Sequence, residues 1–324
     1  MRGGLSVLVV VPLLLTLAVF SLADEPGKNL KLTAKTFAGL ELRNIGPAFM
    51  SGRISDIALH PTDPGTWYVA VGSGGVWRTT NAGTTWKPIF DEQSSYSIGC
   101  VALDPANPLV VWVGSGEDVG GRHVGFGDGV YRSRDGGGTW ENVGLKDSQH
   151  IARILVDPRN SGVVLVAAQG PLWSPSGERG LFRTADGGAS WTKVLGGGEW
   201  TGVTDVVRDP RDPDLLYAAT WQHHRTVAAA MDGGPESGIH KSTDGGVTWR
   251  RLKTGLPDEV MGKIGLAVSP QHPDVVYAAI ELERRTGGFW RSADRGESWK
   301  KMSDTVSGGT GPHYYQELYA SPHA

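Results

Sequence analysis

The sequence contains a single cysteine, Cys100. No disulfide bond can form within the chain, and the cysteine pairs of zinc and redox motifs are excluded. The formal net charge of −3 argues against a broadly basic surface for nucleic acid. Sustained helical periodicity is also lacking, although we consider one short helix near Thr226–Met231. Packing must therefore stabilise the fold, and we expect no metal, no cofactor and no nucleic-acid partner.

Only one long hydrophobic run is present, and it lies at the N-terminus. Arg2 precedes the run Leu5–Leu22, and Ser21-Leu22-Ala23 places small residues at a signal-peptidase site. We therefore predict a signal peptide at residues 1–23, a polar linker at 24–42 and the folded domain at 43–324. An uncleaved anchor is the alternative, because the run approaches the length that spans a bilayer. The predicted location is secreted, periplasmic or at the cell surface, with no further membrane span.

Glycine and tryptophan are abundant, with 47 and 12 copies in 324 residues. They are typical of short strands joined by tight turns, with large rings for packing. One pattern occurs five times: Gly, an apolar residue, a ring residue, a base, Ser/Thr, x, Asp/Asn, x, Gly, x, Ser/Thr, Trp. The copies are Gly75–Trp86, Gly129–Trp140, Gly180–Trp191, Gly238–Trp249 and Gly288–Trp299. Their closing tryptophans are 54, 51, 58 and 50 residues apart.

An apolar strand, a proline turn and a second apolar strand precede each copy. The second strands are predicted at Trp67–Val71, Val110–Gly114, Val163–Ala167, Leu215–Ala219 and Val275–Ala279. Four strands in about 50 residues make a β-propeller blade. The predicted fold is all-β, a propeller of five full blades plus the first strand of a sixth at Leu318–His323. Because that unit stops early, we expect a fragment of a larger propeller, completed by further blades from a longer chain or from partner chains.

The repeated pattern predicts a locked hairpin. Its Asp or Asn can accept backbone N–H bonds inside the turn, its glycine permits positive φ, and its tryptophan covers the hairpin. We assign these residues structural roles and expect the tryptophans to be largely buried. They are Asn81, Trp86, Asp135, Trp140, Asp186, Trp191, Asp244, Trp249, Asp294 and Trp299.

The motif Ser133-x-Asp135-x-Gly137-x-x-Trp140 and its copies resemble the Asp-box, or BNR, repeat. The chain from about Leu42 onward most resembles exported bacterial proteins with a sortilin-like N-terminal propeller domain. Leu42–Pro47, Tyr131–Gly137 and Gly311–Glu317 carry that resemblance. Xyloglucan-degrading glycosidases and sialidases are more distantly similar, so the repeat is shared by enzymes and non-enzymes.

Two departures from the enzymes matter. The Phe/Tyr-Arg-Ile-Pro motif of sialidases is absent. Resemblance to the xyloglucan-degrading enzymes implies a catalytic aspartate before the Gly-Gly of the first blade, and Gly72 stands in its place.

Candidate functional residues lie in the irregular loops opposite the regular turns. Glu117 and Asp118 could act as general acid or base, and His123 follows them; a solvated loop is the alternative. The adjacent His223 and His224 point to opposite sides of an extended chain, which argues against a metal site. Equivalent loops also carry Trp173, Glu178, Arg179, Trp221, Arg225, Asp232, Glu236, Glu281 and Glu283.

The inner strands supply a second group. Five residues before each turn proline stand Asp56, Cys100, Arg153, Asp205, Gly265 and Glu317. Charges on a buried strand cost free energy unless they are paired. We predict that Asp56, Arg153, Asp205 and Glu317 converge on the central channel, either as a salt-bridge ring that fixes the blades or as a ligand pocket.

Two classes of function remain. The first is a sortilin-like binding module that recognises a peptide, protein or carbohydrate on its loop face. The second is a glycoside hydrolase-like enzyme with carboxylates in the channel. The glycine at position 72 and the lack of a recognised catalytic motif favour binding over catalysis.

Overall fold

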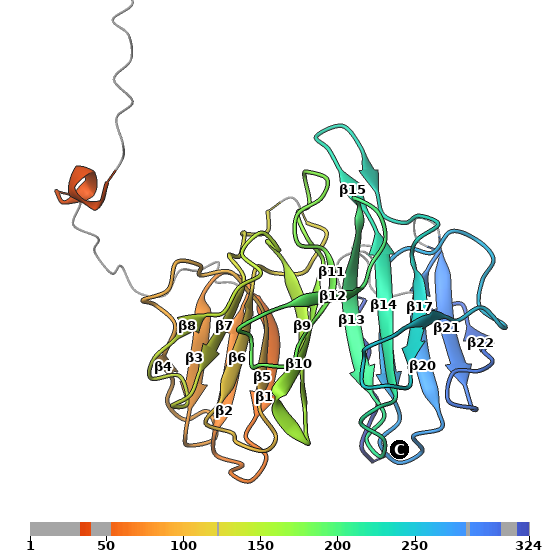
Figure 1. The fold of residues 1–324 in the computed structure, drawn as a ribbon, viewed down its shortest axis with the longest axis horizontal. Coiled ribbons are helices and arrows are strands. Elements are labelled where there is room, and N and C mark those ends of the chain that lie inside the picture. Colours follow the sequence, from red (N-terminus) through yellow and green to blue (C-terminus); the bar gives the residue numbers. More distant parts are fainter. Residues whose placement is uncertain (1–32, 40–52, 122, 283–285, 306–315, 324) are drawn as a thin grey trace, which may run out of the picture. The chain divides into compact units, whose positions relative to one another are not determined.

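The computed structural model describes residues 33–39, 53–121, 123–282, 286–305 and 316–323 (Figure 1). The chain divides into two compact units, residues 1–48 and 49–324. In the first, the structure describes one 3-10 helix, η1 (Ala34–Phe37), within the predicted linker. The predicted signal peptide lies outside the described residues. In the described part of the chain, no helix has the length and apolarity needed to cross a membrane.

Within the described residues, the second unit contains five four-stranded antiparallel sheets, each built from neighbours in sequence. Figure 1 shows them side by side. Sheet 1 comprises β1 (Ile54–Leu59), β2 (Trp67–Val71), β3 (Gly75–Thr79) and β4 (Lys87–Pro88). Sheet 2 comprises β5 (Ile98–Leu103), β6 (Val111–Ser115), β7 (Val130–Ser133) and β8 (Glu141–Asn142).

Sheet 3 comprises β9 (Ile151–Asp157), β10 (Asn160–Ala168), β11 (Gly180–Thr184) and β12 (Thr192–Leu195). Sheet 4 comprises β13 (Thr201–Arg208), β14 (Leu216–Gln222), β17 (Gly238–Ser242) and β18 (Arg250–Arg251). Sheet 5 comprises β19 (Ile264–Val268), β20 (Val276–Glu281), β21 (Gly287–Ser292) and β22 (Lys300–Ser303). The predicted all-β fold of four-stranded units is confirmed, and the predicted Trp67–Val71 coincides with β2.

The short helix considered near Thr226–Met231 is wrong. The segment forms a hairpin of β15 (His224–Arg225) and β16 (Ala230–Met231), which projects beyond sheet 4 in Figure 1. Thr226 closes its turn, because its N–H donates to the carbonyl of Ala229 at 2.7 Å. A tight hairpin satisfies these backbone groups without requiring a helical turn.

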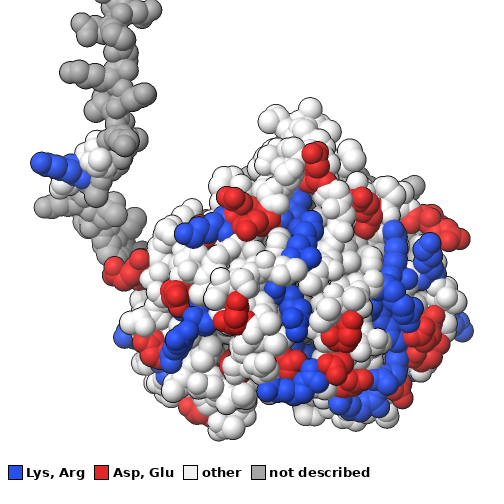
Figure 2. Space-filling view, in the orientation of Figure 1, with Lys and Arg blue, Asp and Glu red and all other residues white. Residues whose placement is uncertain are grey.

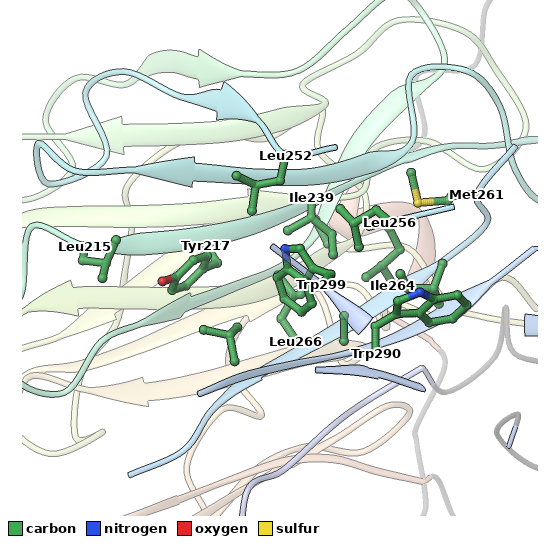
Figure 3. Packing of buried hydrophobic residues seen from close by; sticks show 14 residues of the cluster. Leu215, Tyr217, Ile239, Leu252, Leu256, Met261, Ile264, Leu266, Trp290 and Trp299 are labelled. Atoms are coloured by element: carbon green, nitrogen blue, oxygen red, sulfur yellow. The ribbon is translucent and has the colours of Figure 1, made fainter. Parts of the chain in front are cut away.

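The hydrophobic cores lie between neighbouring sheets. Leu215, Tyr217 and Ile239 of sheet 4 pack with Leu266 and Trp290 of sheet 5 in one buried cluster (Figure 3). Similar clusters join sheets 1 and 2 and sheets 2 and 3. Because an inner sheet is covered on both faces, its strands are apolar on both sides rather than alternating. In sheet 1, by contrast, Ile54, Ile57 and Leu59 are exposed.

The inner strands of sheets 1 to 4 each contain a register shift. It falls at Ser55, Gly99, Ala152 and Thr204, directly before the positions that share the predicted register. An extra residue in one strand bends it and turns the next side chain. The shift thereby orients Asp56, Cys100, Arg153 and Asp205.

Candidate functional site

The aspartates of the repeated pattern close the hairpins between the third and fourth strands. Asp135 accepts hydrogen bonds from the N–H of Thr139 at 2.9 Å and from the Ser133 hydroxyl at 2.7 Å. These bonds lower the pKa of Asp135 to about 2. Equivalent bonds are made by Asn81, Asp186, Asp244 and Asp294. None of these side chains lines the channel described below.

Two tryptophans of the pattern reach back to the preceding sheet, whereas Trp249 and Trp299 bond glycine carbonyls in their own hairpins. The indole N–H of Trp140 donates to the Ile89 carbonyl at 2.7 Å, and that of Trp191 to the Val143 carbonyl at 2.8 Å. Of the five, only Trp299 is buried; Trp140, Trp191 and Trp249 are half-buried, and Trp86 is 39% exposed. The expectation of large burial is wrong for Trp86, because no described sheet covers its side of sheet 1.

The base of the pattern has a role that sequence analysis missed. Its side chain donates to a carbonyl in the hairpin of the next sheet. The pairs are Arg78 to Gly136, Arg132 to Gly187, Arg183 to Gly245 and Lys241 to Arg295. The sequence signal for this role was the recurrence of a basic residue at one position of the pattern. Each of these basic side chains links its sheet to the next one.

The inner-strand residues do come together. Asp56, Arg153, Asp205 and Glu317 line one space of about 10 Å³, together with Asp118, Lys263 and Tyr319. The space is large enough for about one water molecule. The channel at this level is therefore filled by side chains, and a sugar ring would have to bind at its mouth.

Two of these acids link the sheets. The Asp56 carboxylate accepts the N–H of Val101 at 3.1 Å, and the Asp205 carboxylate accepts that of Leu266 at 2.8 Å. Arg153 lies between them, with its Nε 3.4 Å from Asp205. Burial lowers the pKa of Arg153, but the charges of Asp205 and Asp56 hold it above its usual range. These contacts favour the ring interpretation for Asp56, Arg153 and Asp205.

Glu317 and Asp118 stand apart from this ring. Glu317 is exposed and accepts a hydrogen bond from the Tyr319 hydroxyl at 2.9 Å. Asp118 is 8% exposed, and its Oδ2 lies 3.6 Å from Lys263 Nζ. Burial, with a smaller effect of Glu317, raises the pKa of Asp118 to about 6. The space thus holds one carboxyl group that is protonated in mild acid and one exposed carboxylate.

Glu117 occupies the space above Gly72. Its carboxylate is paired with the guanidinium of Arg53, with Nε at 2.6 Å, and the residue is 1% exposed. A Cβ added at Gly72 would lie 2.6 Å from the carboxyl carbon of Glu117. A second blade therefore supplies a carboxylate where resemblance had implied one in the first. His123, the third residue of this predicted group, is exposed.

Three further polar side chains, those of His150, His223 and Glu281, are buried. Burial lowers the pKa of His150 to about 4 and that of His223 to about 3, with smaller effects of nearby cations. Burial also raises the pKa of Glu281 to about 7. His150 lies outside the predicted loops, and only its burial, which sequence does not reveal, marks it.

The two adjacent histidines separate as their alternation predicted. The ring of His223 lies 4.2 Å from that of Trp221, and the ring of His224 lies 3.9 Å from that of Trp200. Over the described ranges, no three His, Cys, Asp or Glu side chains are grouped to hold a metal ion. On the face seen in Figure 2, acidic and basic side chains are interspersed.

Comparison with known proteins finds distant similarity to xyloglucanases. No family model matches it. It is 24% identical over 282 residues to xyloglucanase Xgh74A of Acetivibrio thermocellus, covering 79% of this chain and 31% of the relative. It is 24% identical over 303 residues to a xyloglucanase of Hypocrea jecorina, covering 84% of this chain and 34% of the relative. The chain thus spans about a third of the length of these relatives.

Solved structures agree in fold. An ancestral GH74 enzyme superposes with a TM-score of 0.61 at 22% identity, covering 79% of this chain and 32% of the other. The GH74 xyloglucanase from Xanthomonas campestris superposes with a TM-score of 0.59 at 21% identity, covering 78% of this chain and 39% of the other. The fold is a β-propeller. The chain is distantly similar to GH74 xyloglucanases.

Proposed function

We propose that this propeller belongs to an exported glycoside hydrolase-like protein that acts on a polysaccharide at its loop face. The observation that carries the proposal is that Asp118 and Glu317 line one small space. A pKa of about 6 suits Asp118 to protonate a leaving oxygen, while an exposed Glu317 carboxylate can activate water or stabilise positive charge. The similarity to xyloglucanases supports this reading over the binding module that the sequence favoured.

The loop face offers surfaces for a sugar chain beside these carboxyl groups. Tyr96, Phe126 and Trp173 are exposed there, and Tyr319 is exposed at the channel space itself. Aromatic faces bury the apolar side of a sugar ring while its hydroxyls stay hydrated. A polysaccharide would lie across the mouth, with its scissile bond above Asp118.

A binding module without catalysis is the second candidate. Gly72 offers no carboxylate of its own, and the side chains of Asp56 and Asp205 are engaged in bonds between sheets. If Asp118 and Lys263 also serve only to join loops, the loop face would retain glycans without cleaving them.

Hydrolysis by the full chain decides between the two. Xyloglucan, mixed-linkage glucan and an acidic polysaccharide are incubated with the protein between pH 5 and 7, and reducing ends are counted. We expect cleavage that Asp118→Asn and Glu317→Gln each reduce about a hundredfold or more. Asp304→Asn serves as the control, because Asp304 is an exposed carboxylate directly after β22.

Each other outcome has a definite meaning. Retention of a polysaccharide on an affinity gel without new reducing ends would establish the binding module. Cleavage that survives both substitutions would place the acid elsewhere, with Glu281 as the next residue to test. If the protein neither binds nor cleaves any of the polysaccharides, the proposal is overturned.

A further inference from the structure

Arg225 is a buried arginine whose side chain has no recorded partner among the described residues. The residue is 7% exposed, its Nε is buried without a hydrogen bond, and no described carboxylate forms an ion pair with its guanidinium. It stands on β15, whose backbone pairs with Ala230 of β16. A buried charge without a counter-charge destabilises the folded state. A sequence retains such a group only if something else compensates it.

His223 lies beside Arg225 and is also unpaired. Both ring nitrogens lack a hydrogen-bond partner among the described residues, and the residue is buried. After burial itself, Arg179 and Arg225 are among the charges that lower the pKa of His223. The imidazole is therefore neutral at pH 7, so one nitrogen can donate to a ligand.

The charges around this pair are mainly positive. The guanidinium of Arg179 donates to the carbonyls of Gln169, Pro171, Ser174 and Ser176, and no described carboxylate bonds to it. Lys263 is matched by Asp118, and Glu117 by Arg53. Among the described residues the charges of Arg179 and Arg225 are thus both without a carboxylate, and Arg225 is the one whose Nε makes no hydrogen bond.

The surroundings suit a sugar. The ring of Trp200 lies 3.9 Å from that of His224, tilted to it, and 5.5 Å from the guanidinium of Arg179. Trp173, in the neighbouring loop, is 38% exposed. Aromatic surface next to a fixed cation and a neutral donor is the combination that binds a sugar carrying an anionic group.

We propose that Arg225 and His223 bind the carboxylate or sulfate group of an acidic polysaccharide. The inference rests on the proposed glycan-directed function and names its substrate class. Arg225 supplies a forked pair of N–H donors to two oxygens of the anion, and His223 donates a third hydrogen bond.

Calorimetric titration of the full chain tests this assignment. The probes are oligogalacturonate for the carboxylate, a chondroitin sulfate oligosaccharide for the sulfate, and a xyloglucan oligosaccharide of similar length as the neutral reference. We expect at least one acidic probe to bind tenfold or more tightly than the neutral one. The probe that binds identifies the anion.

Substitutions separate a ligand site from a structural role. Arg225→Met should reduce acidic binding tenfold or more, leave neutral binding within twofold, and keep or raise the urea midpoint, because an unpaired buried charge is removed. Arg250→Met, at an exposed arginine on β18, should change neither affinity. A structural Arg225 would instead show a lowered midpoint with equal losses for all probes, which would overturn the assignment.

The two proposals fail differently. Equal affinity for acidic and neutral probes overturns the anion site and leaves the glycan-directed function standing. If none of the oligosaccharides binds, both the anion site and the glycan-directed function are overturned. Binding of a peptide through its terminal carboxylate, lost on amidation and on Arg225→Met, would reject the polysaccharide as the source of the anion.

Discussion

The carboxylate of Asp205 accepts the backbone N–H of Leu266 at 2.8 Å, across the boundary between sheets 4 and 5. Leu266 follows Gly265, which occupies the same register as Asp205 in the next blade. Asp56 and Val101 repeat the relationship between sheets 1 and 2. An inner strand has an unpaired edge toward the channel, and an acid from the preceding blade satisfies one of its N–H groups.

Asp205→Ala should therefore destabilise the fold. It leaves the Leu266 N–H without its acceptor and Arg153 without its nearest counter-charge. We expect the free energy of unfolding to fall by about 3 kcal/mol, measured by urea denaturation. Asp304→Ala, at an exposed surface pair, should change it by less than about 0.5 kcal/mol. Equal effects of the two would mean that the inter-sheet bond contributes nothing.

Arg132→Met tests the bases of the repeated pattern. The substitution keeps the apolar stem over Trp112 and removes the bond to the Gly187 carbonyl and the exposed ion pair with Glu141. A loss of about 1–2 kcal/mol is expected from the charged hydrogen bond to Gly187 and the cation–π contact, because an exposed ion pair adds little. Arg291 occupies the same position in the last repeat, and no described residue accepts a hydrogen bond from its side chain, so Arg291→Met is the matched control. A comparable loss at both positions would contradict the role of the bond.

The pH dependence of stability should reflect two opposed sets of buried groups. His150 and His223 have pKa values lowered to about 4 and 3, so the folded state binds fewer protons and stability falls as pH drops below about 6.5. Asp118 and Glu281 have pKa values raised to about 6 and 7, so stability falls as pH rises above about 4. Between about pH 4.5 and 6 the two slopes oppose each other.

Replacing one set of groups at a time should show how the other set makes the free energy of unfolding depend on pH. In His150→Gln/His223→Gln, stability should decrease as pH rises through this window. In Asp118→Asn/Glu281→Gln it should increase, with each removed group changing the slope by about 1.4 kcal/mol per pH unit at most. Urea midpoints at half-unit steps of pH measure both. Parallel curves for wild type and both double variants would show that these groups titrate alike when folded and unfolded.

The repeated pattern was sufficient to predict the sheets, because it specifies a hairpin whose hydrogen-bond partners are close together in sequence. Asp135 closes its hairpin with residues at most four positions away, so sequence alone contains every partner. The shared register of Asp56, Arg153, Asp205 and Glu317 also follows from one repeat length. Convergence on a common space was therefore predictable from the register.

The contents of the loops were not predictable in the same way. Arg53 and Glu117 are 64 residues apart, and Lys263 and Asp118 are 145 apart, so no local pattern links them. The register shifts at Ser55 and Thr204 leave no sequence signature of their own. The isolation of Arg225 depends on burial by several loops together, and it appears only in three dimensions.

Gly72→Ala should be costly because of Glu117. An added Cβ would lie 2.6 Å from the Glu117 carboxyl carbon and 2.8 Å from both carboxyl oxygens. A free glutamate could rotate away, but this one is held by two hydrogen bonds from Arg53 and is 1% exposed. Because the pair must shift together, we expect a loss of about 1–3 kcal/mol, typical of overpacking.

A double-mutant cycle identifies the source of that loss. Glu117→Ala removes the carboxyl group, so Gly72→Ala should cost less than about 0.5 kcal/mol in that background. Gly198→Ala is the control, since its Cβ would meet the Glu236 carboxylate at an ordinary 3.5 Å. An unchanged cost of Gly72→Ala after removal of Glu117 would place the strain in the backbone. A coupling of 1 kcal/mol or more would establish that the Glu117 carboxylate fills the room beside Gly72, where a side chain at that position would otherwise project.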